Sequence, residues 1–144
     1  MKTRWAVAAA ALLTVAGCSS GPPDYKPAPG TLVAGTAQVT VNGQNTGTTK
    51  AVQCTPAGSL TTITTGDQTS GVTALISNKD QLTTEAVGIN NLGGFTGSYN
   101  AGLGGNAKVT MTGRTYDISG TADGFTTANP SFRTSGTFAI KVSC

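Results

Sequence analysis

The sequence predicts an all-β domain: an antiparallel sheet of seven to ten strands, curved or folded into a sandwich and closed by one disulfide. Three observations predict this class. Apolar and polar residues alternate along several short stretches, as on strands with one buried face. Glycine and asparagine separate these stretches, and threonine-rich runs such as residues 61–65 favour strand over helix. Charged residues make up only 10% of the 144, which suits an exported β-domain.

The first residues have the pattern of an export signal. Lys2 and Arg4 precede an uncharged, largely apolar stretch at 5–16, which corresponds to the basic and apolar regions of a signal peptide. The stretch has about a dozen residues, whereas a helix needs roughly 20 to cross the hydrocarbon core of a bilayer. We therefore expect residues 1–17 to direct export and not to remain as a transmembrane anchor.

The residues that follow supply a different kind of anchor. Val15, Ala16 and Gly17 directly precede Cys18, and this order resembles the bacterial lipobox. In precursors with that motif the cysteine thiol is diacylated and the preceding peptide bond is cut, which here places cleavage between Gly17 and Cys18. Two or three acyl chains anchor a protein stably, since each buried methylene contributes about 0.8 kcal/mol. The alternative is an ordinary secretory signal that Cys18 happens to follow.

A linker extends from Cys18 to about residue 35. It contains four prolines between positions 22 and 29 and shows no apolar period, which is typical of a semi-rigid spacer. The predicted organisation is a lipoprotein signal peptide at 1–17, the lipidated Cys18 with its proline-rich linker over 18–35, and a β-domain over 36–144. Removing 17 of the 144 residues leaves 127, enough for one domain and a tether.

The β-domain begins with a clear strand and turn. Ala37, Val39 and Val41 alternate with polar residues, and Asn42-Gly43 then predicts a tight hairpin turn. A second hairpin is predicted by alternation on both sides of Gly113-Arg114. The predicted strands after the first are 50–55, 59–65, 72–77, 85–90, 107–112, 115–121 and 137–144.

Two of these strands leave an alternative open. Leu60 and Ile63 are out of phase for a regular strand, which indicates a β-bulge within 59–65. Val72, Leu75 and Ile76 also satisfy helical spacing, so a short helix near 70–77 competes with the strand. We expect the strand.

Two of the three cysteines fit a structural disulfide. With Cys18 assigned to lipid, Cys54 and Cys144 remain as an even pair in an exported protein, where disulfides form and persist. Each lies in phase with the apolar positions of its strand, so we expect a bond that faces the core and joins an early strand to the last one. A redox or metal-binding pair is disfavoured because CxxC spacing and histidine are both missing.

The sequence supplies little for catalysis or metal binding. Without histidine the chain lacks the commonest general base and metal ligand. Asp117 and Asp123 are the acidic pair closest to one hairpin, and a glycosidase would need two carboxylates facing one bond. The glycines at 102–105 precede a predicted strand, and not the helix of a phosphate loop, so they indicate a flexible turn. We expect no enzyme, catalytic residue, metal or cofactor.

Charge and aromatic content constrain the partners. Two of the nine basic residues lie in the signal, so seven basic residues accompany six acidic ones afterwards, and no basic patch favours nucleic acid. Aromatic residues are numerous enough to fill one core or to line an apolar groove, and a core is the expected place for most of them. They are Phe95, Tyr99, Tyr116, Phe125, Phe132 and Phe138.

Taken in order, several short motifs resemble a known family. They are VTVNG at 39–43, VQC at 52–54, GVTALI at 71–76, AVGI at 86–89, YDISGTA at 116–122, ANP at 128–130 and FAIKVSC at 138–144. Together with the lipobox they are similar to the mycobacterial lipoprotein antigens, the family typified by the 19-kDa (LpqH-like) antigen. The resemblance implies an immunogenic cell-envelope lipoprotein, held on the extracytoplasmic face of the cell membrane by lipid on Cys18.

The resemblance also implies partners and a role for the domain. Host Toll-like receptor 2 is expected to sense the acylated N-terminus, and the β-domain is expected to be a non-enzymatic binding or structural module. The alternative is a module that binds or carries an envelope lipid or glycan in an apolar groove. One feature departs from the family: the typical antigen has an O-glycosylated threonine cluster behind the lipidated cysteine. This linker is proline-rich, which weakens the case for glycosylation.

Overall fold

Residues 26–144 are described by the computed structural model of the chain. The predicted signal peptide, Gly17 and Cys18 lie outside the described residues. From residue 26 onward the chain forms ten antiparallel strands and no helix, which confirms the predicted all-β class. The strands are β1 (Ala37–Val41), β2 (Gln44–Thr49), β3 (Val52–Ala57), β4 (Leu60–Gly66), β5 (Gly71–Ser77), β6 (Thr83–Leu92), β7 (Phe95–Asn100), β8 (Ala107–Thr112), β9 (Thr115–Thr126) and β10 (Asn129–Ser143).

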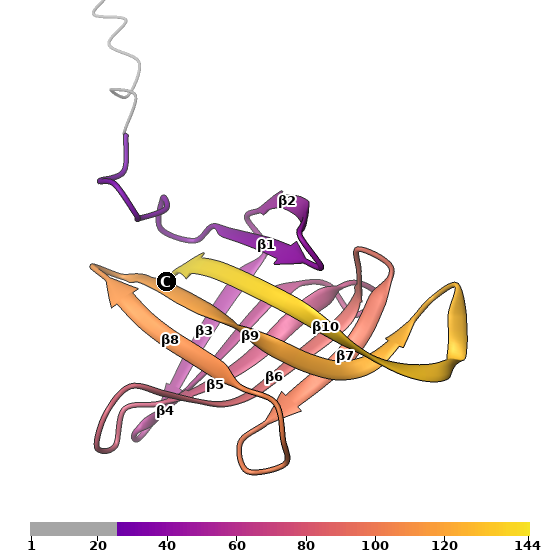
Figure 1. The fold of residues 1–144 in the computed structure, drawn as a ribbon. Coiled ribbons are helices and arrows are strands. Elements are labelled where there is room, and N and C mark those ends of the chain that lie inside the picture. The colour runs from indigo at the N-terminus through magenta and orange to yellow at the C-terminus, as the bar shows by residue number, and fades with distance from the viewer. Residues whose placement is uncertain (1–25) are drawn as a thin grey trace, which may run out of the picture.

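All ten strands belong to one curved sheet that folds into two layers. Their order is β2-β1-β10-β9-β7-β6-β5-β4-β3, with β8 attached to β9. The first half of β9 pairs with β8 and its second half pairs with β7, so the sheet divides along this strand. Strands β1, β8, β9 and β10 form one layer, and β3 to β6 pass behind it at a steep angle (Figure 1). The predicted curved, antiparallel arrangement is confirmed.

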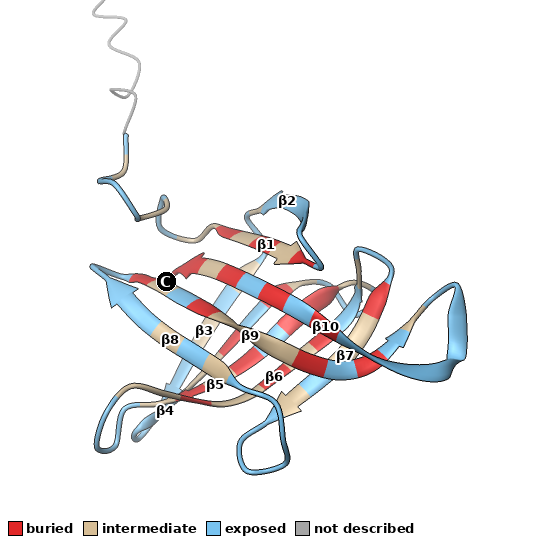
Figure 2. Ribbon diagram, in the orientation of Figure 1, coloured by how far each residue is buried: buried red, intermediate tan, exposed pale blue. Residues whose placement is uncertain are grey.

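The space between the layers is filled by the apolar residues that alternate along the strands. In β10 every second residue from Gly136 to Val142 is buried, whereas those between are exposed or half-buried. Figure 2 shows this alternation as successive red and paler bands. The buried apolar residues come from both layers: Ala37, Val39, Val41, Ile63, Val72, Ala74, Ile76, Val87, Ile89, Phe95, Ile118, Ala122, Phe138, Ile140 and Val142.

Phe95 is the largest fully buried side chain, and its ring lies against Gly97 of its own strand and Gly136 of β10. A Cβ atom at Gly97 would lie 2.6 Å from this ring and 2.8 Å from the carbonyl oxygen of Asp123, and one at Gly136 would lie 2.8 Å from the ring. Side-chain atoms do not approach that closely without displacing something. Glycine at these two positions is therefore required by the packing of Phe95.

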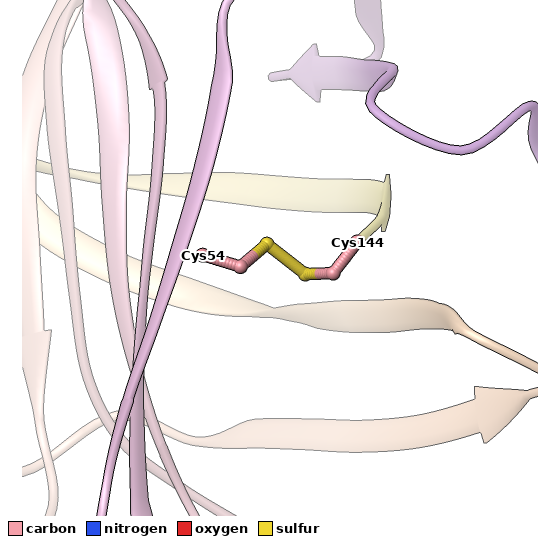
Figure 3. The surroundings of a disulfide bond; sticks show 2 residues. All are labelled: Cys54 and Cys144. Carbon is pink, nitrogen blue, oxygen red and sulfur yellow. A yellow bond between two sulfur atoms is a disulfide. The ribbon is translucent and has the colours of Figure 1, made fainter.

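The disulfide joins the two layers. Cys54 on β3 and Cys144, directly after β10, are bonded with a Cα–Cα distance of 6.0 Å, so the predicted pairing is confirmed. Figure 3 shows the bond crossing from β3 to the end of β10. Cys54 is half-buried against the core, whereas Cys144 is exposed. The bond thus lies at the rim of the core, and the expectation that it faces the core holds for Cys54 only.

Both alternatives left open by the sequence are decided. Residues 71–77 form β5, which pairs along its length with β4 and β6, so the helix near 70–77 is wrong and the strand is confirmed. The predicted bulge within 59–65 is also wrong, because β4 pairs in continuous register on both sides. Leu60 is out of phase with Ile63 for a simpler reason: it is 38% exposed on the outer face, while Ile63 lies in the core.

The sequence pattern did not predict β2 and β7. Strand β2 has no buried residue, so it carries no alternation, and its pairing with β1 follows from the predicted Asn42-Gly43 turn. Both turn residues have positive φ, 51° and 78°, which matches the expected hairpin type. In β7 only Phe95 is fully buried.

Two of the six aromatic residues lie outside the core. Phe95 and Phe138 are buried, and Tyr99 and Tyr116 pack against the core cluster, as expected. Phe125 and Phe132 are 37% and 73% exposed. Both occur where β9 and β10 extend to their shared hairpin, at the edge of the space between the two layers. Sequence alternation could not show where that space ends.

Replacing both bridged cysteines should destabilise the domain strongly. Because the bond closes a loop with a sequence separation of 90 residues, Cys54→Ala/Cys144→Ala should lower the free energy of unfolding by about 4 to 5 kcal/mol in the chain-entropy model. Denaturant unfolding, monitored by far-ultraviolet circular dichroism, measures this difference in the free energy of unfolding. The oxidised wild-type protein in the same buffer is the control, and equal midpoints would contradict a stabilising bond.

Two glycines on adjacent strands should respond oppositely to alanine. At Gly97 the added methyl meets Phe95 and a backbone carbonyl, so Gly97→Ala should destabilise by about 1 to 3 kcal/mol. At Gly88 the nearest atom to a Cβ is 3.9 Å away, so Gly88→Ala should be neutral or stabilise by about 0.5 to 1 kcal/mol. Chemical denaturation of both variants checks this, and equal losses at the two sites would refute the packing argument.

Candidate functional site

The described part of the linker is attached to one end of the domain. The Leu32 N–H donates to Thr115 Oγ1 at 3.0 Å, the Gly35 N–H donates to the Ser143 carbonyl at 2.8 Å, and the Ser143 N–H donates to the Thr36 carbonyl at 3.0 Å. Thr115 and Ser143, which take part in these bonds, are among the few buried polar residues of the described chain. The linker therefore leaves the domain beside the C-terminus (Figure 1), next to the disulfide-bonded Cys144.

The two carboxylates considered for catalysis do not converge. Asp117 and Asp123 are both exposed on β9, six positions apart on the same outer face, which separates them by roughly 20 Å at about 3.3 Å per residue. Asp117 lies opposite Lys141 in the β9–β10 register. Asp123 accepts a hydrogen bond from Ser135 Oγ at 2.9 Å. Neither arrangement brings two carboxyl groups to one bond.

The glycine-rich segment after β7 also has a structural role. The glycines at 102, 104 and 105 form the turn between β7 and β8, which leads into a strand as expected and leaves Leu103 81% exposed. Over residues 26–144, no group of three or more metal-binding side chains gathers. In the same part of the chain, no helix has the length and apolarity to cross a membrane.

The largest hollow of the described surface lies where β4, β5, β6 and β7 approach the β4–β5 turn. It has a volume of about 500 Å³, within the range of about 300 to 1,000 Å³ that is usual for ligand sites. Thr64, Thr73 and Thr96 supply hydroxyl groups to its wall, Asn90 supplies an amide, and Gly88 contributes backbone alone. Val72 and Ile89 also border the hollow, so its wall combines hydroxyl and amide groups with apolar surface.

The β4–β5 turn that borders this hollow is held by its own hydrogen bonds. Oδ1 of Asp67 accepts bonds from Thr69 Oγ1 at 2.7 Å, the Thr69 N–H at 2.8 Å and the Ser70 N–H at 2.9 Å. The Thr69 hydroxyl bond, followed by the two backbone bonds, lowers the pKa of Asp67 below its ordinary value. The turn is also fastened to β6, since Asn90 Nδ2 donates to the Gln68 carbonyl and Ser70 Oγ donates to the Asn91 carbonyl.

A second hollow lies on the other side of the same turn. It has a volume of about 250 Å³ and is bordered by the β2 residues Thr46 and Thr48 and by Ser70. Thr65, Gly66, Asp67 and Gly71 border both hollows. The turn thus separates two adjacent depressions with hydroxyl-bearing walls.

Sequence reasoning missed this site because it sought catalytic and apolar features. The alternative of an apolar groove stays a prediction, because the wall of the largest hollow has both polar and apolar residues. One signal was present in the sequence: Gly88 interrupts the strand pattern Ala86-Val87-Gly88-Ile89-Asn90 at an outward position. Glycine within a strand often marks a close approach of another group.

Comparison with known protein families gives a match over most of the chain. Residues 30–144 match the family described as Mycobacterium 19 kDa lipoprotein antigen. This chain belongs to that family. A protein of Mycobacterium indicus pranii, described as a lipoprotein, is 40% identical over 142 residues, which cover 96% of each chain.

Two relatives carry the name lipoprotein LpqH. The Mycobacterium avium protein is 34% identical over 158 aligned residues, covering 98% of this chain and 96% of its own. The Mycobacterium tuberculosis protein is 34% identical over 108 residues, covering 74% of this chain and 68% of its own. The names of these relatives describe lipoproteins and not enzymes, so this member of the 19 kDa family is a mycobacterial lipoprotein antigen of the LpqH type.

In this antigen, Asp67 should control the order of the β4–β5 turn as a function of pH. Because its folded pKa is lowered, the carboxylate contributes stability above the ordinary aspartate pKa, and this contribution is lost as the pH falls through the lowered value. The amide proton shifts of Thr69 and Ser70 should follow that titration. In Asp67→Ala both shifts should become independent of pH in the acidic range. Unchanged titration curves in the variant would show that another group is responsible.

Proposed function

We propose that this protein is an envelope lipoprotein, held on the extracytoplasmic face of the cell membrane by acyl chains on Cys18 after cleavage between Gly17 and Cys18. The order Val15, Ala16, Gly17, Cys18 after a short apolar stretch is the observation that carries the proposal. Membership of a lipoprotein family supports it. The remaining two cysteines are bonded to each other, so the disulfide does not compete for Cys18.

The attachment of the linker limits how far the domain extends from the anchor. Among the described linker residues, Leu32 is the first that donates a backbone hydrogen bond to a strand of the domain. Fourteen residues, 18–31, precede it, and a fully extended chain of that length spans at most roughly 50 Å. We infer that the domain stays near the membrane, with its disulfide end on the side from which the tether leaves.

The proposal assigns two roles to two parts of the chain. The acylated N-terminus is the part expected to be sensed by host Toll-like receptor 2, as the family resemblance implies. The β-domain serves as a non-enzymatic binding or structural module. The hydroxyl groups of Thr64, Thr73 and Thr96 and the amide of Asn90 in the wall of the largest hollow support a glycan as the ligand of such a module, because each can bond a sugar hydroxyl.

Cys18→Ala should abolish both the anchor and the receptor signal. Because the thiol is the acylation point, the variant expressed in a mycobacterial host should lack the acyl mass, leave the membrane fraction and fail to activate a Toll-like receptor 2 reporter cell line. Intact mass spectrometry, fractionation and the reporter assay measure these three results.

The disulfide variant Cys54→Ala/Cys144→Ala is the matched control for cysteine loss. It should keep the acyl mass and the membrane location, since its two substitutions lie in the folded domain. Recovery of Cys18→Ala in the membrane fraction with full acyl mass would overturn the proposed anchor. An acylated wild-type protein that does not activate the reporter would overturn the receptor assignment alone.

A further inference from the structure

Gly88 is the one described strand glycine that the fold itself does not require. Six described glycines have ordinary, non-positive φ: Gly71, Gly88, Gly97, Gly120, Gly124 and Gly136. At five of them an added Cβ would lie within 2.8 Å of another atom, so close packing excludes a side chain. At Gly88 the nearest atom is the Thr73 carbonyl oxygen at 3.9 Å, an ordinary van der Waals contact. A side chain there would meet neither a steric nor a backbone obstacle.

The missing side chain of Gly88 opens the floor of the largest hollow. Its neighbours Val87 and Ile89 are 1% and 2% exposed and point into the core, so a Cβ at Gly88 would point outward. In the sheet register Gly88 lies between Thr73 on β5 and Ser98 on β7, and Thr73 is paired in turn with Thr64 on β4. A row of hydroxyl-bearing side chains is thus interrupted at one position, which borders the hollow.

The groups around this opening suit a neutral, hydroxyl-rich ligand. Within the described residues, the hydroxyls of Thr64 and Thr73 make no side-chain hydrogen bond to the protein, whereas Thr96 accepts one from the Asn91 N–H. No lysine or arginine borders the hollow, and its one carboxylate, Asp67, is occupied by the turn. An anion would therefore find no countercharge, whereas a neutral ligand with hydroxyl groups would find free hydroxyls on Thr64 and Thr73.

We propose that this hollow binds a neutral saccharide, with a sugar ring seated over Gly88 and its hydroxyls bonded to Thr64, Thr73 and Asn90. The backbone of Gly88 allows the ring to approach the sheet closely, which any larger residue would prevent. The adjoining depression across the β4–β5 turn, bordered by Thr46 and Ser70, provides room for a second sugar unit. The assignment rests on one part of the proposed function, namely that the domain is an exported binding module.

Filling the hollow without disturbing the fold is the direct test. Gly88→Leu places a side chain over the floor, and Ala86→Leu places the same side chain two residues away on the outer face of β6, outside the hollow. The protein purified from a mycobacterial host in detergent micelles is labelled with ¹⁵N. It is titrated with neutral disaccharides of glucose, mannose, galactose and arabinose, and with an acidic disaccharide that contains glucuronic acid.

At least one neutral disaccharide should shift the amide resonances of Thr64, Thr73, Gly88 and Asn90 in the wild-type protein and in Ala86→Leu. Gly88→Leu should bind the same sugar at least tenfold more weakly. Thr73→Val, which keeps the shape and removes the hydroxyl, should also bind more weakly and keeps the test valid if Gly88→Leu does not fold.

Three outcomes would overturn the assignment. They are equal binding by Gly88→Leu and wild type, preference for the acidic disaccharide, and no shift with any neutral disaccharide of the panel. The intact mass of the same preparation reports acylation of Cys18 independently, so loss of sugar binding and loss of the anchor are distinguishable.

Discussion

The fold depends on one strand, β9, that exchanges partners partway along its length. Its first half pairs with β8 and its second half with β7, while β10 pairs along the other side. Gly120 and Gly124 lie at these two junctions. A Cβ at Gly120 would lie 2.1 Å from the Asn106 carbonyl oxygen, and one at Gly124 would lie 1.9 Å from that of Thr96. Only glycine lets the departing strands pass so close to β9, and this divergence bends the sheet into two layers.

Once the sheet is bent, the remaining features follow from covering its inner face. Apolar residues of the two layers meet, and Phe95 fills the space beside the divergence against Gly97 and Gly136. The disulfide then ties β3, the last strand of one layer, to the end of β10 in the other. Because the interior is occupied by its own side chains, a ligand of the domain is expected on the outer surface.

This arrangement separates the two parts of the molecule that have a proposed role. The tether is bound beside Ser143 at the disulfide end of the domain, whereas the saccharide site borders the β4–β5 turn. The Asp67 turn and its bonds to β6 give that site a fixed border on an otherwise exposed loop. A short tether and a rigid surface site suit a module that binds a ligand close to the membrane on which it is held.

The sequence by itself determined the all-β class, the hairpin turn at Asn42-Gly43, the strand character of 71–77 and the pairing of Cys54 with Cys144. These depend on local alternation, local turn chemistry and cysteine number, all of which are visible along the chain. The tertiary structure alone decided that Leu60 faces outward and that β2 and β7 are strands. It also decided that Gly97 is packed against the ring of Phe95, whereas Gly88 has open space beside it. Each of these features depends on the neighbouring strands and on the packing between the layers. The residues that make up this environment are distant in sequence.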